Sequence, residues 1–238
     1  MVNESGAYLP FSGSFGPTVE PFVHFTELIE GALPEPLFRR LLRRTGALGT
    51  ERLRTTYQTT FWYGFDEPTN IVEEAILFLR PRVVKHLRIT GVEWWLSRMY
   101  TTDVRVDFHQ DRDEKLALRT GRLVHPRLSS VLFLNRVRGG ALAITREKPD
   151  PSNPSLAPRK LDDLTLVAPR PNRFVVFDGK LTHGVLDVNN QIPDRKLPGR
   201  PRLRRTIALN WWASRPTDTP TWAEMGIYRA LGTGRRSR

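Results

Sequence analysis

His109 and Asp111 are the residues of this chain whose types and spacing best suit metal chemistry. They follow residues 99–108, in which apolar side chains alternate with polar ones. On an extended backbone, residues two positions apart share a face, so both side chains could reach one metal ion while Gln110 points away. His183, far downstream, would complete a set of two histidines and one carboxylate. Such a triad leaves three coordination positions open, which suits non-haem Fe(II) and O₂ chemistry.

Few other side chains compete for this role. The chain has five histidines and no cysteine, so a metal site must use imidazole and carboxylate, and no disulfide can form. His24 and His86 lie in the N-terminal region, and His125 precedes a proline in a basic loop. We interpret these three as structural residues, with His125 the one that could touch a substrate.

Three further segments follow the His-x-Asp pair along the chain. They are the runs Gly139-Gly140-Ala141-Leu142-Ala143-Ile144, Pro171-Asn172-Arg173-Phe174-Val175-Val176-Phe177-Asp178-Gly179 with His183-Gly184-Val185, and Arg205-Thr206-Ile207-Ala208-Leu209-Asn210-Trp211-Trp212. In this order they resemble the Fe(II)/2-oxoglutarate-dependent oxygenase superfamily, and within it the prolyl-4-hydroxylase-like branch. The resemblance extends from about Trp94 to Ala213.

The resemblance implies a fold, a metal and a co-substrate. The fold is a double-stranded β-helix, a jelly-roll variant. His109, Asp111 and His183 are the implied iron ligands, with Fe(II), 2-oxoglutarate and O₂ as reactants and ascorbate as a stimulant. Because halogenating relatives replace the carboxylate with a small residue, Asp111 favours hydroxylation or a related oxidation.

Arg205 matches the basic residue that binds the far carboxylate of 2-oxoglutarate in the family. A guanidinium offers a planar fork that suits a carboxylate. Arg205 also shares a strand face with Ile207, Leu209 and Trp211, which we interpret as the interior face, whereas Arg204 lies on the other. Arg204 and Arg195 are the competing residues.

Tyr100 lies where the family often has a tyrosine that reaches the co-substrate, although it could equally be a core aromatic. Two departures from the family pattern stand out. Arg205 lies 22 positions after His183, farther than in relatives, which predicts an inserted loop over the site mouth between Asn189 and Arg204. Phe133 stands where close relatives carry a tyrosine, so another hydroxyl would have to replace it.

The pattern along the chain changes near residue 92. Before it we predict a helix over Glu35–Arg44, a strand over Tyr57–Phe65 and a helix over Asn70–Leu87 that Pro81 kinks or breaks. After it, eight short strands suit a closed all-β core: 93–100, 104–109, 128–135, 140–145, 163–168, 173–178, 184–188 and 205–213. Residues 147–158 and 189–201 read as loops.

These elements predict one domain over residues 1–238. Residues 1–91 would form a helical and irregular support region, 92–215 the double-stranded β-helix catalytic core, and 216–238 a C-terminal extension. No internal repeat is visible.

Composition limits the class of protein. A net charge of +12 could attract nucleic acid, but the 37 lysines and arginines are scattered rather than clustered. No run approaches the roughly 18 apolar residues of a membrane span, and no secretory signal is visible. We therefore expect a cytoplasmic protein without a membrane partner; the sequence leaves its oligomeric state open.

The leading hypothesis is a dioxygenase that hydroxylates or otherwise oxidises an unactivated C–H bond of a small molecule or amino-acid residue, releasing succinate and CO₂. One alternative is a nucleic-acid-directed oxidative demethylase, for which Trp62 and Tyr63 could stack on a base. Another is a non-catalytic basic binding module, and a third is a cupin-like metalloenzyme that uses no 2-oxoglutarate.

Overall fold

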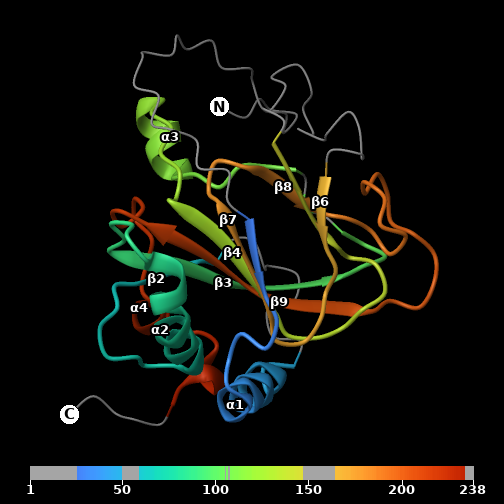
Figure 1. Ribbon diagram of the computed structural model, residues 1–238, viewed down its shortest axis with the longest axis horizontal. Coiled ribbons are helices and arrows are strands. Elements are labelled where there is room, and N and C mark those ends of the chain that lie inside the picture. Colours follow the sequence, from blue (N-terminus) through green and yellow to red (C-terminus); the bar gives the residue numbers. More distant parts are fainter. Residues whose placement is uncertain (1–25, 50–58, 105, 107, 147–163, 234–238) are drawn as a thin grey trace.

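Two antiparallel β-sheets form the centre of the molecule (Figure 1). The computed structural model describes residues 26–49, 59–104, 106, 108–146 and 164–233. One sheet has six strands in the order β1-β7-β4-β9-β3-β2, and the other has three in the order β6-β5-β8. The strands are β1 (Thr26–Ile29), β2 (Phe61–Tyr63), β3 (Gly91–Tyr100), β4 (Leu128–Phe133), β5 (Leu142–Thr145), β6 (Leu164–Val167), β7 (Arg173–Asp178), β8 (Thr182–Val185) and β9 (Leu203–Trp212).

The helices are α1 (Glu35–Gly46), α2 (Ile71–Val84), α3 (Glu114–Thr120) and α4 (Trp222–Met225), with a 3₁₀ turn η2 (Arg229–Leu231). Asn70 begins α2, because its side-chain oxygen accepts hydrogen bonds from the backbone N–H groups of Val72 and Glu73. The predicted break at Pro81 does not occur, and α2 continues to Val84. Tertiary packing of its buried face outweighs the hydrogen bond that the proline removes.

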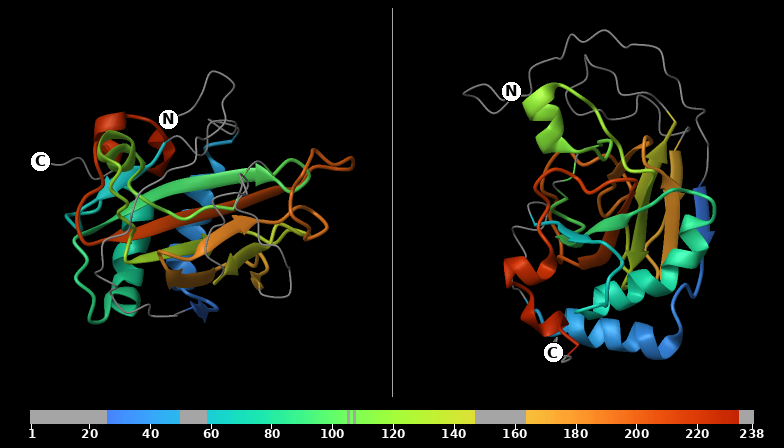
Figure 2. Two further views of the ribbon diagram at one scale, coloured as in Figure 1. Left: turned by 90° about the horizontal axis from the view of Figure 1, so that it is seen from above. Right: turned by 90° about the vertical axis from the view of Figure 1, so that its left-hand side faces the viewer.

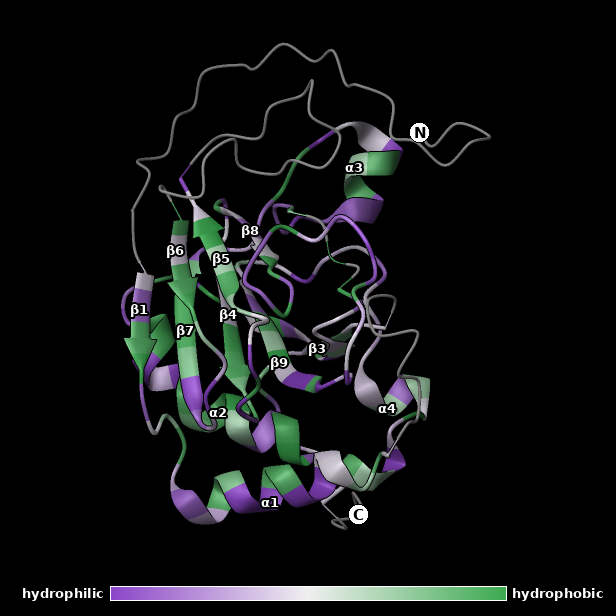
Figure 3. Ribbon diagram, turned by 90° about the vertical axis from the view of Figure 1, so that its right-hand side faces the viewer, coloured by the Kyte–Doolittle hydropathy of each residue, from purple (hydrophilic) through white to green (hydrophobic). Residues whose placement is uncertain are grey.

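Helices α1 and α2 lie side by side and cover the outer face of the six-stranded sheet (Figure 2). Their apolar side chains share one core with the sheet; it includes Leu41, Ile76, Trp94, Ile207, Leu209 and Trp211. The opposite, inner face of the same sheet meets the small sheet through a second apolar cluster, which includes Val131, Phe133, Leu142 and Phe177. Strands β4 and β9 are therefore buried on both faces, and Figure 3 shows both as largely hydrophobic.

Two facing antiparallel sheets closed over an apolar interior confirm the predicted double-stranded β-helix. All but one of the predicted strands are present: β7 has the predicted bounds, β3 and β9 are longer, and the others are shorter. The exception is 104–109, whose described residues join no ladder; the chain turns after Tyr100, and only His109 forms an isolated bridge, to His183. Strand β1 had no sequence prediction. Residues 57–58, 105, 107 and the loop 147–158 lie outside the described residues.

Candidate functional site

His109, Asp111 and His183 converge on one point between the two sheets. One ligand atom from each lies within 4.8 Å of the other two. The Nε2 atom of His109 is 3.6 Å from one Asp111 carboxylate oxygen, and Nε2 of His183 is 3.4 Å from the other. In an octahedral site with donors about 2.1 Å from the ion, adjacent donor atoms lie about 3 Å apart. The three side chains would therefore have to move only slightly toward one another to bind one ion. Two imidazoles and a carboxylate on one side suit a ferrous ion.

The bridge between two distant segments holds the imidazoles together. His109 and His183 exchange both backbone hydrogen bonds, each with an N–O distance of 2.9 Å. Their ring centroids are 4.5 Å apart, and the Phe177 ring packs edge-on against His183 at 4.9 Å. The Nδ1 atom of His183 lies 3.1 Å from the carbonyl oxygen of Leu181, which leaves Nε2 as the ligand atom.

Asp111 is held from the sheet and from its own loop. The Ser129 hydroxyl, on β4, donates to the Asp111 carboxylate at 2.7 Å. His125 contacts the Asp111 backbone carbonyl through Nδ1 at 2.7 Å, so this histidine supports the site rather than forming part of the triad. Gln110 points away, as its spacing predicted, and donates to the carbonyl of Lys180 at 2.6 Å.

The charge states suit metal binding. Burial alone would raise the pKa of Asp111, but the two imidazoles and the Ser129 hydroxyl outweigh it and hold the pKa below its ordinary value. Burial lowers the pKa of His183 to about 4, with His109 acting in the same direction against the opposing charge of Asp111. At neutral pH the site therefore offers a carboxylate and a neutral imidazole, the forms that bind a metal.

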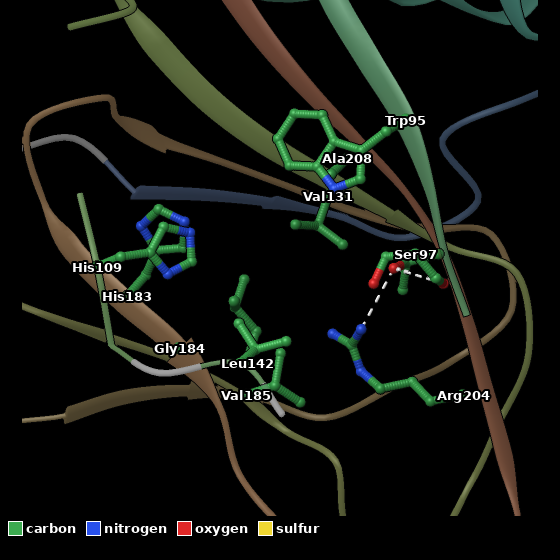
Figure 4. Close-up of a pocket in the computed structure, with 12 residues that line it drawn as sticks. Trp95, Ser97, His109, Val131, Leu142, His183, Gly184, Val185, Arg204 and Ala208 are labelled. Atoms are coloured by element: carbon green, nitrogen blue, oxygen red, sulfur yellow. Dashed lines mark hydrogen bonds between the residues drawn. The ribbon is translucent and has the colours of Figure 1, made fainter. Parts of the chain in front are cut away.

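A cavity extends from the triad along the inner face of the six-stranded sheet (Figure 4). The register aligns its lining side chains in transverse rows across neighbouring strands. One row holds Trp95, Ala208 and Val131, and the next holds Ser97 and Thr206, with Phe133 beside Thr206 in the same row but outside the lining. Arg204 follows at the far end of the cavity, on the same face of β9 as Thr206 and Ala208.

The structure places Arg204, and not Arg205, in the cavity. Arg204 is 2% exposed; its Nε donates to the carbonyl of Gly140 at 2.8 Å and its Nη1 to the Thr206 hydroxyl at 3.2 Å. Arg205 is half-buried on the opposite face of β9. The sequence interpretation was wrong because the apolar face of Ile207, Leu209 and Trp211 packs on the helices, not on the cavity. Arg195, the other competitor, is 77% exposed.

Tyr100 also lies away from the cavity. It is 36% exposed at the end of β3, on the face opposite Trp95 and Ser97. Ser97 and Trp95, which sequence reasoning missed, do line the cavity, and the Ser97 hydroxyl and Trp95 Nε1 are buried without a hydrogen-bond partner among the described residues. Their period-two spacing on one strand was the available signal. Both groups can therefore hydrogen-bond to a molecule that occupies the cavity.

The remaining sequence candidates are accounted for separately. His86 is exposed in the turn after α2, whereas His24 lies outside the described residues. Trp62 and Tyr63 are 8% and 4% exposed, so neither presents a ring on the surface for a nucleobase. No helix among the described residues is long and apolar enough to cross a membrane.

The structure of this chain is similar to several solved structures. HygX from Streptomyces hygroscopicus, solved with nickel and 2-oxoglutarate bound, is 14% identical with a TM-score of 0.50, over 84% of this chain and 85% of its own. A Pseudomonas putida prolyl-4-hydroxylase is 20% identical with a TM-score of 0.48, over 81% and 90%. AviO1 from Streptomyces viridochromogenes Tue57 is 17% identical with a TM-score of 0.48, over 83% and 93%. Scans against protein-family models and curated proteins found no match.

At this level of identity, the likeness to HygX establishes a common fold. That fold agrees with the resemblance of the sequence motifs to the Fe(II)/2-oxoglutarate oxygenases, and the His-Asp-His triad stands in it.

Proposed function

We propose that this chain is an Fe(II)- and 2-oxoglutarate-dependent dioxygenase that oxidises an unactivated C–H bond of a small molecule or amino-acid residue. Succinate and CO₂ would be the co-products. The observation that carries the proposal is the pairing of two ends in one cavity: a facial triad at one end and a buried guanidinium, Arg204, at the other.

His109 and His183 line the same cavity as Arg204, an arrangement that suits a dicarboxylate bound at both of its ends. Arg204 supplies a planar cation for the far carboxylate, in a setting from which water is largely excluded. The hydroxyls of Ser97 and Thr206 stand in the row that also contains Phe133. They provide the hydroxyl groups that a tyrosine at position 133 would otherwise supply, and the unpartnered Ser97 Oγ then has an acceptor.

HygX, which shares the fold, was solved with nickel and 2-oxoglutarate bound. By analogy, the keto-acid end of the co-substrate would lie at the triad of this chain. Trp95 Nε1–H would donate to an oxygen of the guest from the cavity wall, and Val131, Leu142 and Ala208 would keep bulk water out.

When bound by His109, Asp111 and His183, iron would supply the activation of O₂ and the oxidising power for C–H cleavage. The chain's own residues supply geometry. Ser129 fixes the Asp111 carboxylate, and the bridge between His109 and His183 fixes the two imidazoles. These contacts hold all three donors on one side and leave the other side open toward the cavity.

The test is succinate formation by the purified full chain with Fe(II), ascorbate and 2-oxoglutarate. Wild type should release succinate slowly without a substrate and faster with one. His183→Ala should release none, whereas His86→Ala, an exposed histidine outside the site, should match wild type. After anaerobic loading with Fe(II), wild type and His86→Ala should contain similar amounts of iron, and His183→Ala should contain less. Equal activity of His183→Ala and wild type would disprove the assignment.

A further inference from the structure

The row that supports the triad continues across the whole six-stranded sheet. Its register runs from Trp62 on β2 through Glu93 on β3, Asn210 on β9, Ser129 on β4 and Phe177 on β7 to Thr26 on β1. Ser129 holds Asp111, and Phe177 packs on His183, so the triad stands over the second half of this row. Glu93 stands two strands from Ser129, about 10 Å away at the usual strand spacing of about 4.8 Å.

Glu93 shares the inner face with the cavity lining, because Trp95 and Ser97 follow it at two-residue intervals on β3. It lies to one side of the triad, whereas the path from the triad to Arg204 runs along the sheet through later rows. A dicarboxylate on that path would leave the Glu93 side of the metal open. Glu93 is also half-buried rather than fully enclosed.

Three tryptophans surround Glu93 on this face. Trp62 is its direct cross-strand neighbour, and its ring contacts Gly91, where an added Cβ would lie 2.3 Å from the indole. Trp95 is the next inward residue on β3, and Figure 4 shows its indole extending across the cavity. Trp212 donates from Nε1 to the Glu93 carboxylate at 3.2 Å.

The charge of Glu93 has no cationic partner among the described residues. Its hydrogen-bond donors are Trp212, the Thr60 hydroxyl and the Asn210 amide, all of them neutral. Burial raises the pKa of Glu93 to about 7 against these hydrogen bonds, and the charge of Asp111 adds to the rise. Neutral donors satisfy the carboxylate's lone pairs but do not neutralise its charge, so what the site lacks is a cation.

A carboxylate among aromatic rings is a surface that favours ammonium groups over neutral ones, because ring faces attract cations and the carboxylate adds a direct charge. We infer that the substrate carries an ammonium or alkylammonium group, which Glu93 binds together with Trp62, Trp95 and Trp212 beside the metal. This inference rests on the proposed function for the identity of the metal and names the substrate class for the same site.

A purely structural role for Glu93 is the competing explanation. In that role it would only join β2, β3 and β9 through Thr60, Trp212 and Asn210. Gln in its place keeps an acceptor for Trp212 and removes only the charge. A structural role then predicts no change in ligand preference, whereas our inference predicts loss of the preference for cations.

The test uses choline and its neutral isostere 3,3-dimethyl-1-butanol, which differ in charge but hardly in shape. Both are titrated into the full chain, metal-free and then loaded with Ni(II) and 2-oxoglutarate, and tryptophan fluorescence reports binding. Wild type should bind choline about tenfold more tightly than the alcohol. Glu93→Gln should reduce choline to the affinity of the alcohol. Trp62→Leu should weaken choline several-fold.

Glu35→Gln is the matched control, because Glu35 is exposed on α1 and its ion pair within the described part of the chain is with Arg39. It should leave both affinities unchanged. Equal binding of the two probes, no binding of choline, or a Glu93→Gln protein that keeps the preference would each overturn the inference. The metal-free titration does not depend on the oxygenase chemistry. Failure of 2-oxoglutarate to bind the Ni(II) form would instead count against the proposed function alone.

Discussion

Replacement of Arg204 by methionine should abolish tight binding of 2-oxoglutarate, whereas the same replacement at Arg205 should not. The two residues are adjacent and alike in chemistry, yet β9 points them to opposite faces. Arg204 ends in the cavity, with its guanidinium 5.2 Å above the Phe133 ring and held by Gly140 and Thr206. Methionine keeps most of the volume and removes the charge and the donors.

The size of the effect follows from the burial. Removing one partner of a buried, hydrogen-bonded charge pair costs about 2–5 kcal/mol, which is roughly 30-fold to 4,000-fold in affinity. Thr206 and Ser97 stay in the variant and can still donate to the carboxylate. We therefore expect a loss in the lower half of that range, about 100-fold.

Thermal unfolding of the Ni(II)-loaded chain gives a direct assay. A ligand at about 100 times its Kd stabilises the folded state by about 2.7 kcal/mol, and a 100-fold weaker Kd leaves about 0.4 kcal/mol. For a domain of this size, 1 kcal/mol shifts Tm by about 2–4 °C. Wild type and Arg205→Met should gain about 5–10 °C with 2-oxoglutarate, and Arg204→Met about 1 °C.

Metal affinity provides the internal control, because neither arginine contacts the triad. All three proteins should bind Ni(II) equally. If Arg204→Met keeps the full thermal gain while Arg205→Met loses it, then the inner face of β9 has been misassigned and with it the path of the co-substrate.

Three other changes have defined outcomes. Ser129→Ala removes the hydrogen bond to Asp111 and should lower Fe(II) affinity about tenfold in an anaerobic competition titration, whereas Ser130→Ala, on the other face, should lower only stability. Gly184→Ala would place a methyl carbon 2.9 Å from a phenylalanine ring beside the triad, and a lower Tm together with weaker metal binding should follow. Because the pKa of Glu93 is raised in the folded state to about 7, the folded chain binds that proton more tightly than the unfolded chain, so the metal-free protein should lose about 3 kcal/mol as pH rises from 4.5 to 7. Denaturant titrations should find this slope absent in Glu93→Gln; an unchanged slope would contradict the raised pKa.

The triad could be predicted from sequence because its geometry is local. Two residues separated by one position share a face of any extended backbone, whether or not that backbone joins a sheet. The predicted strand 104–109 is not a ladder, yet His109 and Asp111 still point to one place. The distant partner, His183, was recognisable from its flanking motif, and its bridge to His109 brings the two segments together.

The end of the cavity that holds Arg204 could not be predicted from the sequence in the same way. Alternation along β9 separates Arg204 from Arg205 but does not tell which face lines the cavity, because both faces are buried. The more apolar face was taken for the interior, but that face packs against α1 and α2. In a sandwich flanked by helices, the most hydrophobic face of a central strand can be the helix-facing one, because a cavity that binds a polar guest needs polar side chains.

Cross-strand register supplies the information that alternation lacks. Once β3, β9 and β4 are aligned, Ser97 and Thr206 form one polar row, and Glu93, Asn210 and Ser129 form another. Residues that are more than 30 positions apart in sequence thus become neighbours at a spacing set by the sheet. The same alignment separates the two roles that we propose for the inner face: one row leads toward Arg204, the proposed site of an anionic co-substrate, and the other carries Glu93, the proposed site of a cationic substrate. The site is therefore polarised, with its positive end along the sheet from the triad and its negative end across it. A co-substrate and a substrate of opposite charge would thus be directed to different sides of the same metal.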